Sequence, residues 1–299
     1  MLNVAELVPE KKSAARHLDK HRTQEWLTQQ IARAKHEPVA EVVTLTPMLA
    51  RLLLDRNDEN RPISALAVDR YKRDLTTGLW EFNGEKIVVS KEGHLNDGQH
   101  RCLAVVETGR AMKVVMVFGA DRDSRMTLDQ GVSRTAAHYV GMNGHADATA
   151  VATVAAWIWQ YREKGILTSR GRDRPTKSEI LFTANHYADI AESLSAVSSK
   201  DVAPIGTRAL VAFCHWAIAQ AAGSIEATAF INKLINGDGL RQGNAILYAR
   251  KRLLQMRGQR GISANDRAEI IFKAWNSYRV GSTQDFFRIT GGPLPKLEA

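Results

Sequence analysis

The pattern of apolar residues changes near residue 140. Before that point, short runs rich in β-branched residues are interleaved with stretches of helical periodicity, and the runs at residues 41–46, 86–90 and 113–118 predict strands. From residue 146 onward, apolar residues recur every three to four positions, as in residues 151–158 and 209–222, which predicts helices. The pattern therefore predicts an α+β fold class, with a small mixed α/β domain followed by an all-helical C-terminal domain.

Several residues predict where these helices begin and end. Pro47 is suited to the first turn of a helix, and Ser64 is suited to cap another helix that Gly78 ends. Residues 99–107 have a helical pattern closed by Gly109. Ser263, followed three positions later by an aspartate, predicts the start of the last helix.

Three segments follow from these patterns. Residues 1–38 are polar and basic, and we expect a helical extension that Pro38 ends, since the residue before a proline avoids the helical conformation. Residues 39–140 form the mixed domain, in the order strand, helix, helix, hairpin, turn, helix and strand. Residues 141–299 form the helical domain.

Composition adds to these predictions mainly by indicating which kinds of partner the protein could bind. The 299 residues are 44% hydrophobic, which is typical of a globular protein, and 41 Lys and Arg against 32 Asp and Glu give a net charge of +9. A basic protein tends to associate with polyanions, so nucleic acid, nucleotides and anionic membranes are the partners to consider. Cys102 and Cys214 are far apart and lack a C-x-x-C pairing, which excludes a zinc finger and favours a reducing compartment.

The sequence carries no secretory signal pattern and no apolar run long enough to span a bilayer. We therefore expect no membrane partner and a cytoplasmic location, in a bacterial cell or a phage-infected host. A homodimer is compatible with the sequence, which does not fix the oligomeric state.

The turn at residues 97–101, D-G-Q-H-R, is the strongest candidate for chemistry. It lies between a predicted strand and a predicted helix, and the free N–H groups and positive dipole end of a helix N-terminus attract anions. Asp97 is the expected N-cap, while His100 and Arg101 place cationic side chains where they are unfavourable unless an anion compensates them. A capped helix start with solvated polar side chains is the alternative interpretation.

This turn resembles the signature turn of the ParB/sulfiredoxin superfamily, and more closely that of ParB-like proteins with D-G-Q-H-R in phage and actinobacterial genomes. Asn60, Arg61, Tyr71, Gly78 and Trp80 before the turn extend the resemblance. Further residues extend it to roughly residues 40–290: Leu103 to Gly109, Leu128 to Gly131, Arg134, Thr135 and Lys273 to Asn276.

In that superfamily the turn holds nucleotide phosphates: ParB proteins bind CTP and clamp DNA, sulfiredoxins bind ATP, and a free-serine kinase branch transfers phosphate. The resemblance implies that the residues after Asp97 bind the phosphates of CTP or ATP, namely Gly98, Gln99, His100 and Arg101. Asp97 would shape the turn, hold Mg²⁺ or act in catalysis. Gln99 stands where sulfiredoxin chemistry requires a cysteine, and no dimerising ParB C-terminal module is recognisable, so neither activity is carried over.

The same resemblance supplies a wall for the phosphate pocket. It implies that this wall is formed by Asn60, Arg61, Asp129 and Arg134. For Asp129 and Arg134, a loop with an internal ion pair is an equally good interpretation.

Residues 241–260 contain six basic residues and no acidic one. Such a segment can contact DNA phosphates with sequence-independent, salt-sensitive affinity. The candidate DNA-binding residues are Arg250, Lys251, Arg252, Arg257 and Arg260. A solvated basic surface is the alternative.

These observations predict a DNA-associated, ParB-like protein that binds a nucleoside triphosphate with Mg²⁺ at residues 97–101, with nucleotide hydrolysis or phosphotransfer as the chemistry if it is an enzyme. A metal-dependent DNA nuclease is one alternative, but it needs convergent carboxylates, for which Asp97, Glu107 and Asp129 are the candidates. A non-enzymatic factor that binds a phage or host protein is the other.

Overall fold

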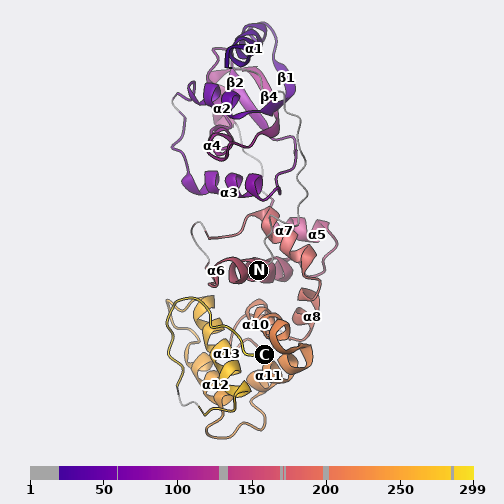
Figure 1. Ribbon diagram of the computed structural model, residues 1–299, viewed down its shortest axis with the longest axis vertical. Coiled ribbons are helices and arrows are strands. Elements are labelled where there is room, and N and C mark those ends of the chain that lie inside the picture. Colours follow the sequence, from indigo (N-terminus) through magenta and orange to yellow (C-terminus); the bar gives the residue numbers. More distant parts are fainter. Residues whose placement is uncertain are drawn as a thin grey trace. The chain divides into compact units, whose positions relative to one another are not determined.

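The computed structural model describes residues 20–58, 60–127, 134–168, 171, 173–197, 202–283 and 286–299. The chain divides into two compact units, Met1–Ser133 and Arg134–Ala299 (Figure 1). Each unit has its own hydrophobic core, and each is described separately below. The described elements combine a four-stranded sheet with many helices, which agrees with the predicted α+β class.

The first unit contains a four-stranded mixed sheet in the order β1-β4-β2-β3. Strand β4 pairs antiparallel with β1 and parallel with β2, while β2 and β3 form an antiparallel hairpin. The described elements of this unit are α1 (Lys20–Arg33), β1 (Val39–Leu45), α2 (Pro47–Leu54), α3 (Ala65–Thr76), β2 (Lys86–Ser90), β3 (Leu95–Asp97), α4 (Gln99–Thr108), β4 (Met112–Ala120) and the 3-10 helix η2 (Arg122–Thr127).

The core of the first unit fixes the position of α4. Helices α2 and α3 both pack against α4, and its Cys102 and Val105 are fully buried together with Ile87 of β2 and Phe118 of β4. Gly109 ends α4 in the left-handed conformation, as its sequence position predicts. The start of α4 is therefore held between the sheet and two helices.

Helix α1 belongs to this core, although the sequence pattern indicated a separate extension. Leu27 is fully buried, and the Trp26 ring packs edge-on against Phe118 with 5.9 Å between ring centroids. Burial of these two apolar side chains attaches the basic helix to the sheet.

The second unit is helical throughout its described part. Its elements are α5 (Ala136–Met142), α6 (Ala148–Lys164), α7 (Lys177–His186), α8 (Ile190–Ser195), α10 (Arg208–Ala222), α11 (Ser224–Asn236), α12 (Ala245–Gln255) and α13 (Ala264–Arg279). Helix α10 is central: residues 210–218 are all buried, and it packs against α6, α8, α11 and α13. None of the helices in the described ranges has the length and apolarity that crossing a membrane requires.

Trp216 and Trp275 are almost completely buried in the core of this unit. Ser263 caps α13 and forms a capping box with Asp266, as the sequence indicates. After α13, residues 286–299 lie without helix or strand against the unit, and Phe287 and Leu294 bury their side chains there.

Candidate phosphate-binding turn

The D-G-Q-H-R segment forms a strand–turn–helix connection. Asp97 is the last residue of β3, and Gly98, with φ of 109°, precedes the first turn of α4. A Cβ atom at Gly98 would lie 2.8 Å from Cγ1 of Ile87, so both the backbone conformation and the packing require glycine. The prediction that Asp97 is the N-cap is wrong: Gly98 occupies that position, and no side chain caps the helix.

The start of α4 leaves its backbone donors unused. The N–H groups of Gln99, His100 and Arg101 donate to no acceptor within the described chain, and the first helical hydrogen bond runs from Cys102 N–H to Gly98 O. All three residues are less than 9% exposed. A buried helix start with unpaired donors is the arrangement that an anion satisfies.

Arg101 is held by the protein itself and not presented to a ligand. It is 4% exposed, donates to the carboxylate of Glu85, and contacts Lys86 O at 2.7 Å and Asp97 Oδ2 at 3.0 Å. These contacts connect α4 to the loop before β2 and to β3. In this structure Arg101 therefore holds the turn together, and its guanidinium is engaged by two carboxylates.

His100 presents one free donor near the unpaired N–H groups. Its Nε2 accepts the backbone N–H of Ser64 at 2.9 Å, so the ring is neutral and its proton lies on Nδ1. Nδ1 has no acceptor within the described chain. Burial lowers the pKa of His100, and the positive charges of Arg61 and Arg101 lower it further against the opposing effect of Asp97.

Gln99 fastens the loop before α3 to the turn. Its side chain accepts from Asn57 Nδ2 at 3.0 Å and donates to Arg61 O at 2.9 Å. Asn60 strengthens this connection by donating to Leu95 O. The loop that carries Arg61 is thus fixed beside the start of α4 by two amide side chains.

The expected pocket-wall residues have different places in the structure. Asn60 lies beside the turn, and Arg61 is close enough for its charge to shift the pKa of His100. Arg61 is exposed and has no ion-pair or hydrogen-bond partner for its side chain among the described residues. Arg134 is exposed at the start of the second unit, and Asp129 lies outside the described residues.

The carboxylates do not form a metal centre in the described part of the chain. Asp97 pairs with Arg101, whereas Glu107, about two turns further along α4, pairs with Lys72 at 2.6 Å. No group of three or more His, Cys, Asp or Glu side chains in the described ranges is placed to hold a metal ion. One ion-paired carboxylate does not fit a resident Mg²⁺ site, and we derive no step through a metal.

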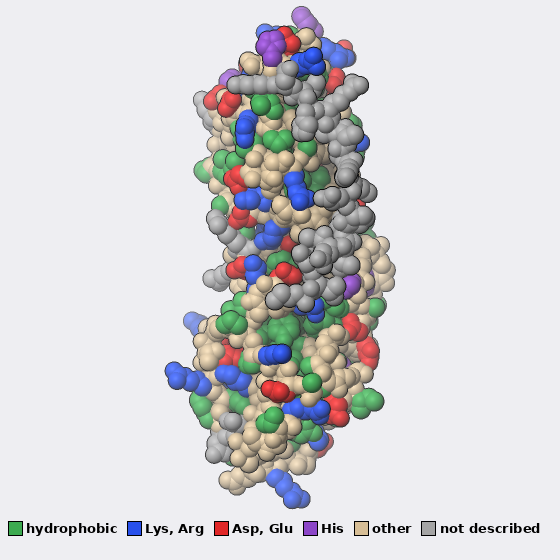
Figure 2. Space-filling view, viewed as in Figure 1, with side chains coloured by type: hydrophobic (Ala, Val, Ile, Leu, Met, Phe, Trp, Pro, Cys, Tyr) green, Lys and Arg blue, Asp and Glu red, His purple; other side chains and the backbone are tan. Residues whose placement is uncertain are grey.

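The basic residues of α12 are not equivalent. Arg250 donates to the carbonyls of Leu234 and Ile235 at the end of α11, so it closes that helix, and Arg252 lies over the Phe286 ring. Lys251, Arg257 and Arg260 are exposed. On the face shown in Figure 2, the blue Lys and Arg side chains of the second unit lie singly among neutral and acidic ones.

Sequence reasoning missed two residues that build the turn. Glu85 supplies a carboxylate to Arg101, and Arg122 donates to Asn96 Oδ1 at 2.8 Å, to Leu95 O at 3.0 Å and to Asp58 O. Both are ordinary charged residues in sequence. The sequence signal was a cationic residue, Arg101, in the first turn of a predicted helix, where it needs a nearby negative charge.

Comparison with known proteins adds no family to these observations: no family model matches the chain, and neither the curated proteins nor the solved structures include one that is significantly similar to it. A proposed function therefore rests on the turn and its contacts, the basic residues, and the motif resemblance described above.

Proposed function

We propose that the protein binds a nucleoside triphosphate, CTP or ATP, with its phosphates at the start of α4, and that it associates with DNA. The observation that carries the nucleotide proposal is the set of three unpaired backbone N–H groups in the buried first turn, at residues 99–101. The resemblance to ParB-like proteins supports the choice of a nucleotide over other anions.

Within this proposal, the side chains that would contact the phosphates differ from those that the sequence indicated. His100 offers Nδ1–H, and Arg61 offers an unpaired guanidinium from the loop that Gln99 fixes. Arg101 stabilises the turn through its contacts with the carboxylates of Glu85 and Asp97. Mg²⁺ enters this proposal only as the counter-ion that accompanies the triphosphate.

A reaction at this site would be phosphoryl transfer, because positioning and charge neutralisation are what the turn offers. Asp97 is the carboxylate at the turn, but its Oδ2 accepts from Arg101 at 3.0 Å. We therefore expect slow hydrolysis at most without a separate acceptor, and the binding step is the part of the proposal to test first.

Replacement of Arg61 by alanine should weaken nucleotide binding about tenfold, since a charge-assisted contact to phosphate is lost while the fold keeps its contacts. The measurement is isothermal titration calorimetry of CTP and of ATP, each with Mg²⁺. Arg70→Ala is the matched control, because Arg70 is also exposed in the first unit but is not among the charges that shift the pKa of His100. Failure of wild type to bind either nucleotide, or equal loss in the two variants, would contradict the proposal.

For DNA, we take the exposed Lys251 and Arg260 as the phosphate contacts: Lys251 lies over the Tyr248 ring, and neither side chain has an ion pair among the described residues. Their joint replacement by glutamine should weaken duplex binding at low salt and reduce the dependence of log K on log salt by about one to two. Fluorescence anisotropy with two unrelated duplexes measures both quantities. A double Arg51→Gln and Arg70→Gln variant removes the same charge from the first unit, and an equal effect there would leave only a net-charge effect and refute a DNA surface on the second unit.

A further inference from the structure

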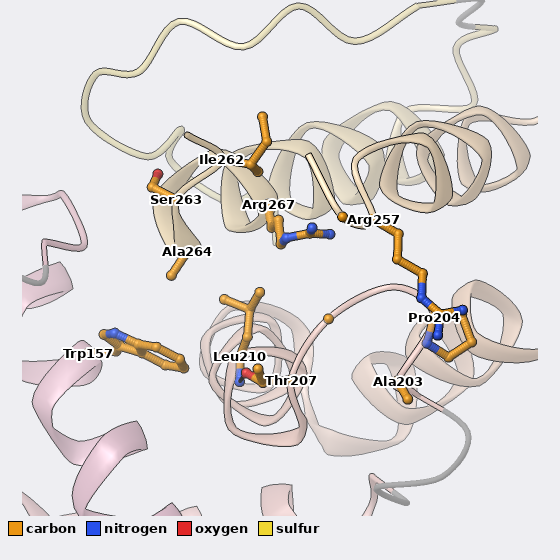
Figure 3. A pocket seen from close by; sticks show the side chains of 12 residues that line it. Trp157, Ala203, Pro204, Thr207, Leu210, Arg257, Ile262, Ser263, Ala264 and Arg267 are labelled. Atoms are coloured by element: carbon orange, nitrogen blue, oxygen red, sulfur yellow. Dashed lines mark hydrogen bonds between the residues drawn. The ribbon is translucent and has the colours of Figure 1, made fainter. Parts of the chain in front are cut away.

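The second unit contains a pocket of about 370 Å³, and none of its lining residues belongs to the turn described in the first unit. It lies between α6, the start of α10 and the connection from α12 to α13, all within one unit (Figure 3). None of its twelve lining residues is acidic, while two of them, Arg257 and Arg267, are arginines. The pocket thus concentrates positive charge.

Arg267 carries a charge that the protein only partly balances. Its guanidinium donates to three backbone carbonyls, Met256 O at 2.9 Å, Ile205 O at 3.2 Å and Leu253 O at 3.4 Å, and it pairs with no carboxylate among the described residues. Three of its five N–H groups are used, so Nε–H and one Nη2–H remain. Burial lowers the pKa of Arg267, as expected for a positive charge without a counter-ion.

Further donors border the same pocket. Arg257 is exposed, has no ion pair in the described chain, and approaches the pocket in Figure 3. Two helix N-caps, Thr207 of α10 and Ser263 of α13, also line it, and each uses its hydroxyl to accept the third N–H of its own helix. Asp266 is the carboxylate of the α13 capping box: it accepts the N–H of Ser263 and does not line the pocket.

The rest of the lining is apolar. Trp157, Leu210 and Ile262 are the largest apolar side chains of this lining, and the Trp157 ring lies edge-on against Phe213 at 6.3 Å between centroids. Figure 3 shows Trp157 and Arg257 at opposite ends of the pocket, with Leu210 and Arg267 between them. An occupant would therefore have an apolar body and an anionic head.

We propose that this pocket binds a small phosphate monoester with a planar or apolar body. The phosphate would lie against Arg257 and Arg267, and the body against Trp157, Leu210 and Ile262. Two guanidinium groups at one pocket suit a dianion better than a carboxylate. This site is separate from the nucleotide site proposed in the first unit, which uses other residues.

Phenyl phosphate is the probe, and the indole N–H resonance of Trp157, identified by comparison with Trp157→Phe, is the readout. Titration should shift this resonance in a saturable way, with benzoate and inorganic phosphate binding more weakly and phenol not measurably. Arg257→Gln should weaken phenyl phosphate about tenfold. Arg241→Gln is the matched control, because Arg241 is also an exposed arginine of the second unit but does not line the pocket, and it should bind as wild type does.

Three results would overturn the proposal. They are a Trp157 resonance that phenyl phosphate leaves unmoved at millimolar concentration, equal weakening by Arg257→Gln and Arg241→Gln, and phenol or benzoate binding as tightly as phenyl phosphate. Arg61→Ala, which tests the nucleotide site, should leave this titration unchanged, so the two proposals succeed or fail separately.

Discussion

Replacement of Arg101 by leucine should lower the free energy of unfolding by about 3 kcal/mol, because it removes one member of a largely buried charge network. The guanidinium is shared by Glu85, Asp97 and the carbonyl of Lys86, and leucine leaves all three without that donor. Part of the loss is offset by water at Glu85, whose side chain is 56% exposed, so the expected cost lies at the lower end for a broken buried pair.

Urea unfolding of the purified protein measures this loss, with far-ultraviolet circular dichroism as the signal. Arg61→Leu is the control: it removes the same charge from the same region, but Arg61 is exposed and its side chain has no hydrogen bond or ion pair in the described chain, so its cost should stay below about 0.5 kcal/mol. Equal stability of the two variants would show that the Arg101 network does not hold the turn. A loss of nucleotide binding in Arg101→Leu would reflect the damaged turn, which is why Arg61 is the sharper probe of the ligand.

The parts of the fold that the sequence predicts correctly are those determined by residues close together in the chain. Strand β2 occupies the predicted residues 86–90, Ser64 caps α3, and Ser263 with Asp266 caps α13. Each of these depends on residues within about four positions of one another, where the physical rule acts without knowledge of the rest of the chain. The same holds for Gly109, which ends α4.

The site itself depends on contacts that no local pattern contains. Arg101 meets Glu85 across 16 positions, and His100 meets the backbone of Ser64 across 36. The prediction that Asp97 caps α4 is wrong because Asp97 is still part of β3 and Gly98 is the N-cap residue. The Asp97 carboxylate accepts a hydrogen bond from Arg101 instead. The strand–turn–helix form of residues 97–101 was thus predictable from sequence, while the distant partners of His100 and Arg101 were not.

A second limit concerns basic residues. The absence of acidic residues at positions 241–260 predicted one DNA-binding segment, but its basic side chains make different contacts in the structure. Arg250 closes α11 through Leu234 O and Ile235 O, and Arg257 borders the pocket. The charge of a segment does not show which of its basic side chains donate to the carbonyl groups at helix ends, because those carbonyl groups belong to other elements.

The largest loss of stability is expected at Glu269, whose replacement by alanine should cost about 4 kcal/mol. This carboxylate is fully buried in α13 and accepts from the backbone N–H groups of Thr290 and Gly291, the Thr290 hydroxyl and the Lys273 ammonium at 2.6–3.2 Å. Alanine leaves the donors of Thr290 and Gly291 without their acceptor, while Lys273 keeps its contact with Arg288 O. Glu226→Ala, at an exposed position of α11, should cost less than about 0.5 kcal/mol.

The same contacts predict how this stabilisation depends on pH. Burial alone would raise the pKa of Glu269, but hydrogen bonds from Lys273, Thr290 and Gly291 outweigh it and hold the pKa below the ordinary 4.5. A carboxyl group whose pKa is lower in the folded state stabilises the protein above its unfolded pKa and loses that contribution as the pH falls through the folded value. The difference in unfolding free energy between wild type and Glu269→Gln should therefore be constant near neutrality and shrink below about pH 4.5. Urea titrations of both proteins across this range measure it, and a difference that stays constant into acid would show that the ionised carboxylate is not what holds Thr290 and Gly291.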